Sequence, residues 1–225
     1  MNPGVFESQI NRSWNLLLDL GLGSERKTHP IYPTKAASLF RDAGYVETWN
    51  KCFSDGLYHF LLNDLSLVQF RVDSYNPLKA SYVYYECPYL PAVSFEDFLE
   101  GLGVESGDED ESYYREEYDS AVVQQLKESY TPIRYDFDPI CYVSGRHPAS
   151  HIHFGHGNNI RVGTKMIMKP LSFILFILRQ CYPDHWQQFW TRHEADLWAR
   201  EVNINLDPIN AKYYQDKDSW EMPLV

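Results

Sequence analysis

Apolar residues recur at helical spacing near the start of the chain, and this spacing predicts a helix over residues 5–20 that ends at Gly21. A short second helix is expected over residues 34–43, with Thr34 as its N-cap. Residues 121–130 are expected to form a further helix. The N-terminal part of the chain is therefore predicted to contribute helices that flank the rest of the fold.

The strongest apolar run lies near the other end of the chain. Residues 170–182 are apolar nearly all round a helix, which predicts a helix buried at the centre of the protein. A run of this length is too short to cross a bilayer, which needs about 20 apolar residues. A last helix is expected to follow, with Asp184 as its N-cap.

The remaining segments show strand patterns. Residues 45–86 are rich in Tyr, Val, Phe and Leu and are broken by turn dipeptides, which predicts three or four antiparallel strands in a meander. Residues 131–162 return to strand-like sequence. We therefore predict an α+β fold: a mostly antiparallel sheet packed on the central helix, with flanking N- and C-terminal helices. One domain is expected over residues 1–225, with an acidic insert at about 93–120.

Charge is concentrated in that insert. The chain has 225 residues and a formal net charge of −11, which argues against a general nucleic-acid coat protein. Eleven acidic residues and one basic residue lie between Glu96 and Asp119, so the rest of the chain is close to neutral. Apolar residues from Phe95 to Leu102 predict a short helix within this stretch. We interpret most of it as a solvated loop, with docking on a basic partner or mimicry of a phosphate backbone as alternatives.

The cysteines and the termini bear on the compartment. The chain has four cysteines, none within 30 residues of another, so the spacing fits neither a zinc ribbon nor a C-x-x-C pair. No apolar stretch is long enough for a transmembrane helix, and the first ten residues do not resemble a secretory signal. We therefore expect buried thiols in a cytoplasmic protein that does not associate with membranes.

Titratable side chains gather in two neighbouring strand-like segments. Arg134, Asp136 and Asp138 occupy alternate positions of the first, and His151 and His153 occupy alternate positions of the second. Side chains alternate between the faces of a strand, so each set shares one face. If the two strands pair, their apolar residues enter the core together and the five polar side chains meet on the opposite face.

Such a face supports three interpretations. His151, His153 and Asp136 are a usual ligand set for Zn²⁺, Mn²⁺ or Fe²⁺ with a position open to water, and for phosphodiester chemistry we expect Zn²⁺, Mn²⁺ or Mg²⁺. Alternatively, a His–Asp pair acts as general base and orienting group, while Arg134 or Arg161 stabilises an anionic transition state. The third interpretation is a structural hydrogen-bond network that fixes the edge of the sheet.

Neighbouring residues extend the candidate site. Arg161 and Asn159 fall on an expected third strand, and His147 precedes a proline in a loop, as a third imidazole or merely a turn residue. We expect these three to contact a ligand or a phosphate group. The residues proposed to carry the chemistry are Asp136, Asp138, His151, His153 and Arg134.

Several of these segments resemble a bacterial domain-of-unknown-function family, number 2290. The resemblance covers residues 45–89, the Arg134-Tyr-Asp136 element, the segment from His147 to Gly155 and the helix at 170–182. It implies a bacterial cytoplasmic protein with no established activity, in the vicinity of mobile-element and phage-defence genes. A fainter similarity links the Arg-x-Asp and His-x-His strands to small bacterial toxins that cleave RNA.

Two function classes follow. The first is an enzyme, toxin-like in a defence or mobile-element system, that acts on a phosphodiester in RNA or in a nucleotide. The second is a non-catalytic adaptor that binds a basic protein surface, of a partner from the same operon, through the acidic segment. A DNA-mimic inhibitor fits less well, because the negative charge is confined to one segment. We favour the enzyme.

Overall fold

The computed structural model describes residues 1–28, 30, 43–90, 95–103, 114, 118, 125–157, 160–192, 206–215 and 218. The chain divides into two compact units. Met1–Glu86 and Thr131–Val225 form the first unit, and Cys87–Tyr130 forms the second.

A seven-stranded antiparallel sheet is the centre of the first unit, and its strands lie side by side in chain order. This arrangement confirms the predicted α+β class and the antiparallel sheet. The strands are β1 Gly23–Arg26, β2 Phe60–Leu62, β3 Leu67–Tyr75, β4 Leu78–Tyr85, β5 Ile133–Phe137, β6 Ser150–Phe154 and β7 Ile160–Gly163.

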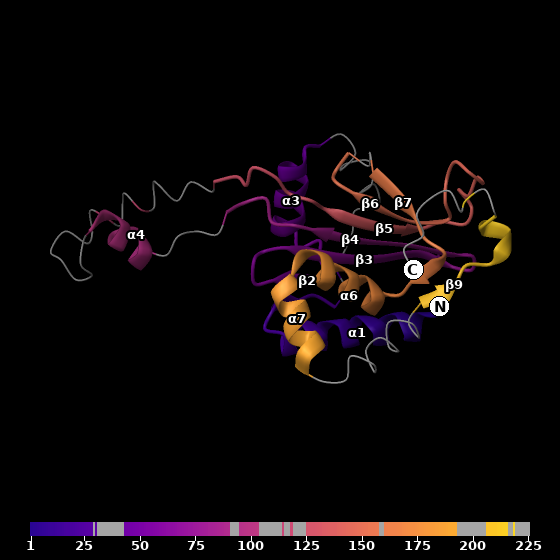
Figure 1. The fold of residues 1–225 in the computed structure, drawn as a ribbon, viewed down its shortest axis with the longest axis horizontal. Helices are drawn as coiled ribbons and strands as arrows, with labels where there is room; N and C mark the ends of the chain where they lie inside the picture. Colours follow the sequence, from indigo (N-terminus) through magenta and orange to yellow (C-terminus); the bar gives the residue numbers. More distant parts are fainter. Residues whose placement is uncertain are drawn as a thin grey trace. The chain divides into compact units, whose positions relative to one another are not determined.

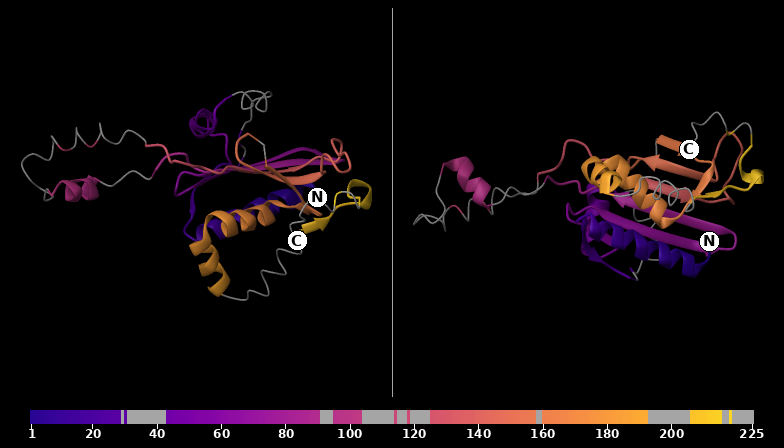
Figure 2. Two further views of the ribbon diagram at one scale, coloured as in Figure 1. Left: turned by 45° about the horizontal axis from the view of Figure 1, so that its top comes forward. Right: turned by 60° about the horizontal axis from the view of Figure 1, so that its bottom comes forward.

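Helices cover the sheet from both sides, as Figure 1 and the left view of Figure 2 show. Helix α1 (Pro3–Asp19) and helix α6 (Pro170–Cys181) pack against one face, and α3 (Tyr45–Ser54) lies over part of the other. Helix α7 (Pro183–Arg192) follows α6 directly. None of the helices in the described ranges is long and apolar enough to cross a membrane.

The C-terminal part of the first unit adds small elements. Strand β8 (Met166–Met168) pairs with β9 (Leu206–Pro208) in a separate two-stranded sheet, and a 3₁₀ helix, η1, spans Ala211–Tyr213. After η1 the chain reaches Asp218, which is buried.

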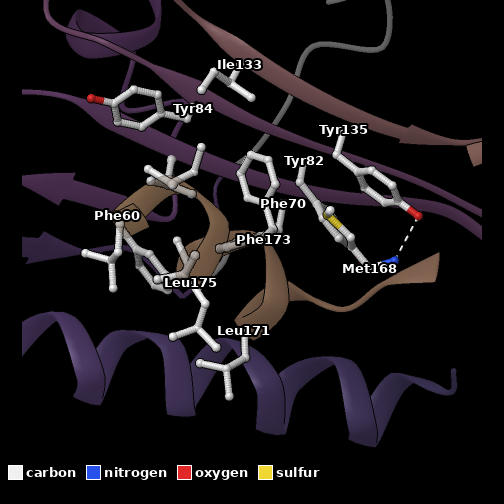
Figure 3. Close-up of a cluster of buried hydrophobic side chains, with 14 of the residues drawn as sticks. Phe60, Phe70, Tyr82, Tyr84, Ile133, Tyr135, Met168, Leu171, Phe173 and Leu175 are labelled. Atoms are coloured by element: carbon white, nitrogen blue, oxygen red, sulfur yellow. Dashed lines mark hydrogen bonds between the residues drawn. The ribbon is translucent and has the colours of Figure 1, made fainter. Parts of the chain in front are cut away.

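The hydrophobic core lies between the sheet and the α1–α6 layer (Figure 3). Alternate residues of β3, β4 and β5 supply aromatic rings to it, and Phe173 of α6 packs against the rings of Phe70 and Tyr82. The hydroxyl of Tyr135 accepts a hydrogen bond from the backbone N–H of Met168 (3.0 Å), drawn as a dashed line in Figure 3. The buried helix predicted at 170–182 is confirmed as α6.

Residues 45–54 correct the predicted meander, because they form helix α3 rather than a strand. Tyr45, Thr48, Trp49 and Cys52 are buried on one side of this helix at three- and four-residue spacing. That spacing is helical. Bulky aromatic residues suit strands as well, so composition favoured the wrong element. The following three strands, β2 to β4, form the antiparallel meander that was expected.

Other boundaries also differ from expectation. Helix α1 agrees with the prediction for residues 5–20, while residues 34–42 lie outside the described part of the chain. Of the helix predicted over residues 121–130, residues 121–124 lie outside the described part of the chain, and residues 125–130 are not helical, since Leu126 pairs with Tyr89 in a β-bridge. Helix α7 begins at Pro183, so Asp184 is not the N-cap that was predicted. It lies in the first turn of the helix, where its negative charge interacts favourably with the helix dipole.

The second unit holds the acidic part of the sequence. Its described residues include helix α4 (Phe95–Leu102), which confirms the short helix predicted there, and Leu99 on this helix is buried. Backbone hydrogen bonds from Leu90 to Gln125 and from Lys127 to Pro88 join the two ends of the unit. Most of the stretch from Glu96 to Asp119 lies outside the described residues.

Candidate functional site

Polar side chains from three neighbouring strands meet on the face of the sheet opposite the α1–α6 core. On β5 and β6, Asp136 pairs with His151 and Arg134 pairs with His153. On β7, Arg161 lies opposite His153 as well. The predicted pairing of the two polar segments, and its phase, are therefore confirmed.

The alternation that builds this face is clear in β5. Its residues are buried and half-buried in turn, with Ile133, Tyr135 and Phe137 on the core side and Arg134 and Asp136 on the polar side. The same strand thus supplies the core and the site.

The carboxylate of Asp136 is held by hydrogen bonds to both of its oxygens. The Ser81 hydroxyl donates to Oδ1 (2.7 Å), and Nε–H of Arg134 donates to Oδ2 (2.8 Å). Burial raises the pKa of Asp136, but the His153 ring, the Arg134 guanidinium and the Ser81 hydroxyl outweigh it, so the pKa lies well below its ordinary value. Asp136 is therefore an anion with a fixed orientation.

His151 is fixed in one tautomer. Its Nδ1–H donates to the carbonyl oxygen of Pro148 (2.9 Å), since a carbonyl can only accept. Burial lowers the pKa of His151 to about 4, against the opposing charge of Asp136, so the ring is neutral near pH 7. Its Nε2 therefore carries a lone pair, and this atom lies 3.8 Å from Oδ2 of Asp136.

His153 completes the cluster and is held less firmly. Its side chain is 1% exposed, and its Nε2 lies 3.5 Å from Oδ2 of Asp136. Its buried Nδ1 has no hydrogen-bond partner among the described residues. The rings of His151 and His153 are edge to face, with centroids 4.7 Å apart. Of the two imidazoles, His151 is thus the better oriented ligand.

The three side chains fit a metal ion. Each of Asp136, His151 and His153 offers one ligand atom, and these atoms all lie within 4.8 Å of one another. For bonds of about 2.1 Å, two ligands of a tetrahedral ion lie about 3.4 Å apart. The observed separations of 3.5 and 3.8 Å are close to that value. The bonds from Pro148, Ser81 and Arg134 are the kind of outer contacts that orient metal ligands.

A cavity of about 620 Å³ opens over this cluster. Four cationic side chains line it against three carboxylates, which leaves a mildly basic wall. Three of these cations are paired: Arg71 with Asp73 (3.0 Å), Lys79 with Asp138 (2.8 Å) and Arg134 with Asp136 (2.8 Å). Arg161 is exposed and has no ion pair with a described residue.

The other histidines of the cluster have different surroundings. The ring of His147 stands edge-on to that of His151, with centroids 5.1 Å apart, and lines the cavity without joining the three ligand atoms. The Nε2–H of His156 donates to the carbonyl oxygen of Ala43 (2.9 Å) and so tethers the turn after β6 to the start of α3. His147 is close enough to contact a bound ligand, whereas His156 is engaged with the backbone.

Two predicted residues are not part of the cluster. Asp138 lies beyond the end of β5, where its carboxylate pairs with Lys79 and accepts from the backbone N–H groups of Ile140 and Cys141. It lines the cavity, but these contacts give it a role in the turn, and a catalytic role stays a prediction. Asn159 lies outside the described residues.

Sequence reasoning missed several contributors. Ser81 lies opposite Asp136 on β4, and Arg71 and Lys79 line the cavity from β3 and β4. The alternation of these two strands could have placed all three on the polar face, since Ala80 and Tyr82 are buried on the other. The carbonyl of Pro148 carries no signal in the sequence, because any residue type has one.

Comparison with known proteins gives a family. A family model described as "Uncharacterized conserved protein (DUF2290)" matches residues 25–214, most of the chain, and so confirms the resemblance found in the sequence. No curated protein and no solved structure matches. The comparisons therefore name no activity, and the function has to be argued from the site.

Proposed function

The chain belongs to the uncharacterized conserved family DUF2290, and we propose that it is a divalent-metal-dependent hydrolase that cleaves a phosphodiester bond in RNA or in a nucleotide. One observation carries the proposal. Three metal-ligand atoms, from Asp136, His151 and His153, converge in a cavity that Arg161 also lines, together with Arg134, whose Nε is bound to Asp136.

The tautomer of His151 favours metal chemistry over the other two interpretations. In a structural network, or in a His–Asp pair with Asp136 as the orienting group, His151 would donate a ring N–H to the Asp136 carboxylate, just as Ser81 and Arg134 donate to it. The Nε2 of His151 instead directs a lone pair towards an anion at 3.8 Å. Two electron-rich atoms at this distance repel one another unless a cation lies between them. Two imidazoles and one carboxylate favour Zn²⁺ or Mn²⁺ over Mg²⁺, which prefers oxygen ligands.

The arginines favour a phosphate group as the substrate. Arg134 uses Nε for Asp136, so its terminal nitrogens remain free to bind an anion, and no described residue hydrogen-bonds to them. Arg161 lies two strands away, about 10 Å between backbones, on the other side of His153. The two arginines thus flank His153, and guanidinium groups are suited to bidentate binding of phosphate oxygens.

The roles of the residues follow from these positions. A bound divalent cation would supply positive charge to a phosphoryl oxygen and make water a better nucleophile. Asp136, His151 and His153 would hold it, while Ser81 and Pro148 keep two of these ligands oriented. Arg134 and Arg161 would bind the phosphoryl group and stabilise the charge that develops on it.

The proposal includes a setting in the bacterial cytoplasm, in a defence or mobile-element system. This setting is what the resemblance of the sequence to the family implies. The four cysteines are free thiols, as is usual in a reducing compartment. A protein partner from the same operon belongs to the same proposal.

The test starts with metal content. Tag-free protein is analysed by ICP-MS and assayed on bis(p-nitrophenyl) phosphate and on single-stranded RNA, beside a His151→Ala/His153→Ala variant. We expect near-stoichiometric transition metal and hydrolysis in the natural protein, and a loss of more than about 100-fold in kcat/KM with folding retained in the variant. His185→Ala, which removes an imidazole from helix α7, is the matched control and should keep both.

Two results would contradict the proposal. One is hydrolysis that persists unchanged in the double variant. The other is a natural protein that binds no metal and hydrolyses neither substrate. In the second case, deletion of residues 96–119 with a pull-down of the operon partner tests the non-catalytic alternative, which predicts that the deletion abolishes binding.

A further inference from the structure

A carboxylate far along the sequence is buried beneath the loop that borders the site. Asp218 is 4% exposed and receives hydrogen bonds on both oxygens. Oδ1 accepts from the backbone N–H of Gly145 (2.6 Å) and from the Ser144 hydroxyl (3.4 Å). Oδ2 accepts from the Tyr142 hydroxyl (2.6 Å) and from the backbone N–H of Gln215 (2.7 Å). A buried carboxylate with these four donors is a rigid anchor for the loop.

The loop that it holds is a tight turn. Val143 and His147 form a β-bridge with two backbone hydrogen bonds, of 2.9 and 2.7 Å. Between them Gly145 adopts a φ of 68°, a conformation that L side chains rarely adopt. The Asp218 carboxylate accepts from the N–H of this same glycine, so it fixes the turn at its sharpest point.

The turn leads directly into the metal site. The residue after its bridge is Pro148, whose carbonyl oxygen accepts Nδ1–H of His151. The ring of His147, the last residue of the bridge, stands edge-on to the His151 ring. Both contacts that orient the His151 imidazole from outside the sheet thus come from the loop that Asp218 holds.

We propose that Asp218 is a positioning residue for the metal site, because it fixes the loop whose Pro148 carbonyl and His147 ring orient His151. The inference rests on the proposed metal site and assigns the C-terminal segment a role in it. Partners that orient metal ligands typically change metal affinity by about 10–100-fold. Asp218 acts one contact further out, so we expect the lower end of that range.

The test uses Co²⁺ alone, without substrate. The visible absorption spectrum and the Kd for Co²⁺ are measured on the full chain and on Asp218→Asn, which exchanges one acceptor oxygen for a donor. We expect a Kd about tenfold higher and a changed absorption band, because the His151 ring is less well fixed. Asp218→Glu keeps both acceptor oxygens and should restore part of the affinity. Tyr142→Phe removes one donor, serves if Asp218→Asn does not fold, and should weaken binding two- to threefold.

Asp64→Asn is the matched control. Asp64 also accepts from a tyrosine hydroxyl, that of Tyr182 (2.8 Å), and from a backbone N–H, that of Ser66 (3.0 Å), but it does not line the cavity. Because Asp64 is exposed and has two donors where Asp218 has four, this variant should lose less thermal stability than Asp218→Asn, and it should keep the Kd and spectrum for Co²⁺.

The outcomes separate the two proposals. If the natural protein binds no Co²⁺, the proposed function fails, and this inference fails with it. If the natural protein binds Co²⁺ and the Asp218 and Tyr142 variants bind it with the same Kd and spectrum, the inference alone is overturned. Equal weakening in Asp64→Asn would also overturn it, because the effect would then reflect general stability.

Discussion

The two faces of the central sheet are built from the same strands but differ in the side chains that they carry: one is packed with aromatic and apolar residues, and the other holds a cluster of charged and polar residues. On the core face, Tyr82 and Tyr135 pair across β4 and β5, and both are fully buried among apolar side chains. On the other face, one residue away on the same strands, Ser81 and Asp136 pair, and the carboxylate is oriented towards two imidazoles. The core face gains stability from burial. The polar face gathers groups that a stable fold does not need.

The contrast between the two faces indicates which residues are present for function and which for stability. A buried histidine pair beside a carboxylate costs desolvation free energy, and replacing such a group as a whole by apolar residues of similar volume often leaves stability unchanged or higher. The core face offers no such gain, since every lost ring leaves a cavity. Substitutions on the two faces should therefore separate stability from ligand binding, and the following predictions test that separation.

The largest expected effect is on the core face. Phe173 of α6 is fully buried and packs on the rings of Phe70 and Tyr82. Phe173→Ala should lower the free energy of unfolding by about 3–5 kcal/mol, through lost burial and a residual cavity. Urea denaturation followed by circular dichroism measures it. Phe53→Ala, at a ring 38% exposed on α3, is the control, and an equal loss there would contradict the core assignment.

The next effect belongs to the polar face and appears only with metal. At a Zn²⁺ concentration of 100 Kd, the natural protein should gain about 2.7 kcal/mol in the free energy of unfolding by mass action. Asp136→Asn should lose this gain, because the ligand carboxylate is gone. Each variant is compared with and without Zn²⁺, so its own change in stability cancels.

Asp138→Asn sharpens the same measurement. Asp138 lies two residues further along the chain and lines the same cavity, but Lys79 and two backbone N–H groups engage its carboxylate. This variant should keep the full stabilisation by Zn²⁺. A loss equal to that of Asp136→Asn would mean that the ligand set has been assigned to the wrong carboxylate.

The polar face was the more predictable of the two from sequence, and its strands show why. Polar and apolar residues alternate along β5 and from His151 to Phe154 of β6, so Arg134, Asp136, His151 and His153 could be placed on one face once the strands were assumed to pair. The central helix was equally clear, because the run from Leu171 to Leu178 leaves no polar side. These features are local, and a local pattern is sufficient to predict them.

The features that could not be predicted depend on contacts distant in sequence or on the backbone. Asp218 meets Gly145 across more than 70 residues, and nothing in either segment predicts that contact. The Pro148 carbonyl is a backbone group, which no residue type marks. Helix α3 was mistaken for a strand because Tyr45 and Trp49 fit both elements, and only the burial pattern on the folded sheet decides between them.

A smaller loss of stability is expected from removing a buried hydrogen bond on the core face, the one that the Tyr135 hydroxyl accepts. The Tyr135 hydroxyl accepts the Met168 N–H and lies 3.0 Å from the Ser150 hydroxyl. Tyr135→Phe leaves the Met168 N–H buried without its acceptor and should cost about 1–3 kcal/mol in the free energy of unfolding. Thermal and urea denaturation measure it.

Tyr82, which pairs with Tyr135 across β4 and β5, provides a control in which the same substitution should not lower stability. The buried hydroxyl of Tyr82 has no hydrogen-bond partner among the described residues. Tyr82→Phe removes an unsatisfied polar group from the core, so its stability should be unchanged or higher. Equal losses in Tyr82→Phe and Tyr135→Phe would show that the packing of the hydroxyl oxygen, and not its hydrogen bond, determines the cost.

The smallest effect on stability, and the most selective on binding, is expected at Arg161. This side chain is exposed and has no ion pair with a described residue, so Arg161→Ala should change the free energy of unfolding by less than about 0.5 kcal/mol. Arg161 lies opposite His153 in the register of the sheet and lines the cavity, so its guanidinium can bind a phosphate oxygen there. Affinity for orthophosphate, measured by calorimetry with metal present, should fall about ten- to hundredfold, as for one charge-assisted hydrogen bond.

Arg146→Ala tests whether position or total charge is responsible. Arg146 is also exposed and belongs to the turn next to His147, but it does not line the cavity. If Arg161 acts only through long-range attraction, both variants should bind phosphate more weakly than the natural protein by the same factor. This weakening should then disappear at high salt. A direct contact predicts a loss in Arg161→Ala alone that persists as salt is raised, because a guanidinium bound to phosphate in the cavity is less screened than one in open solvent.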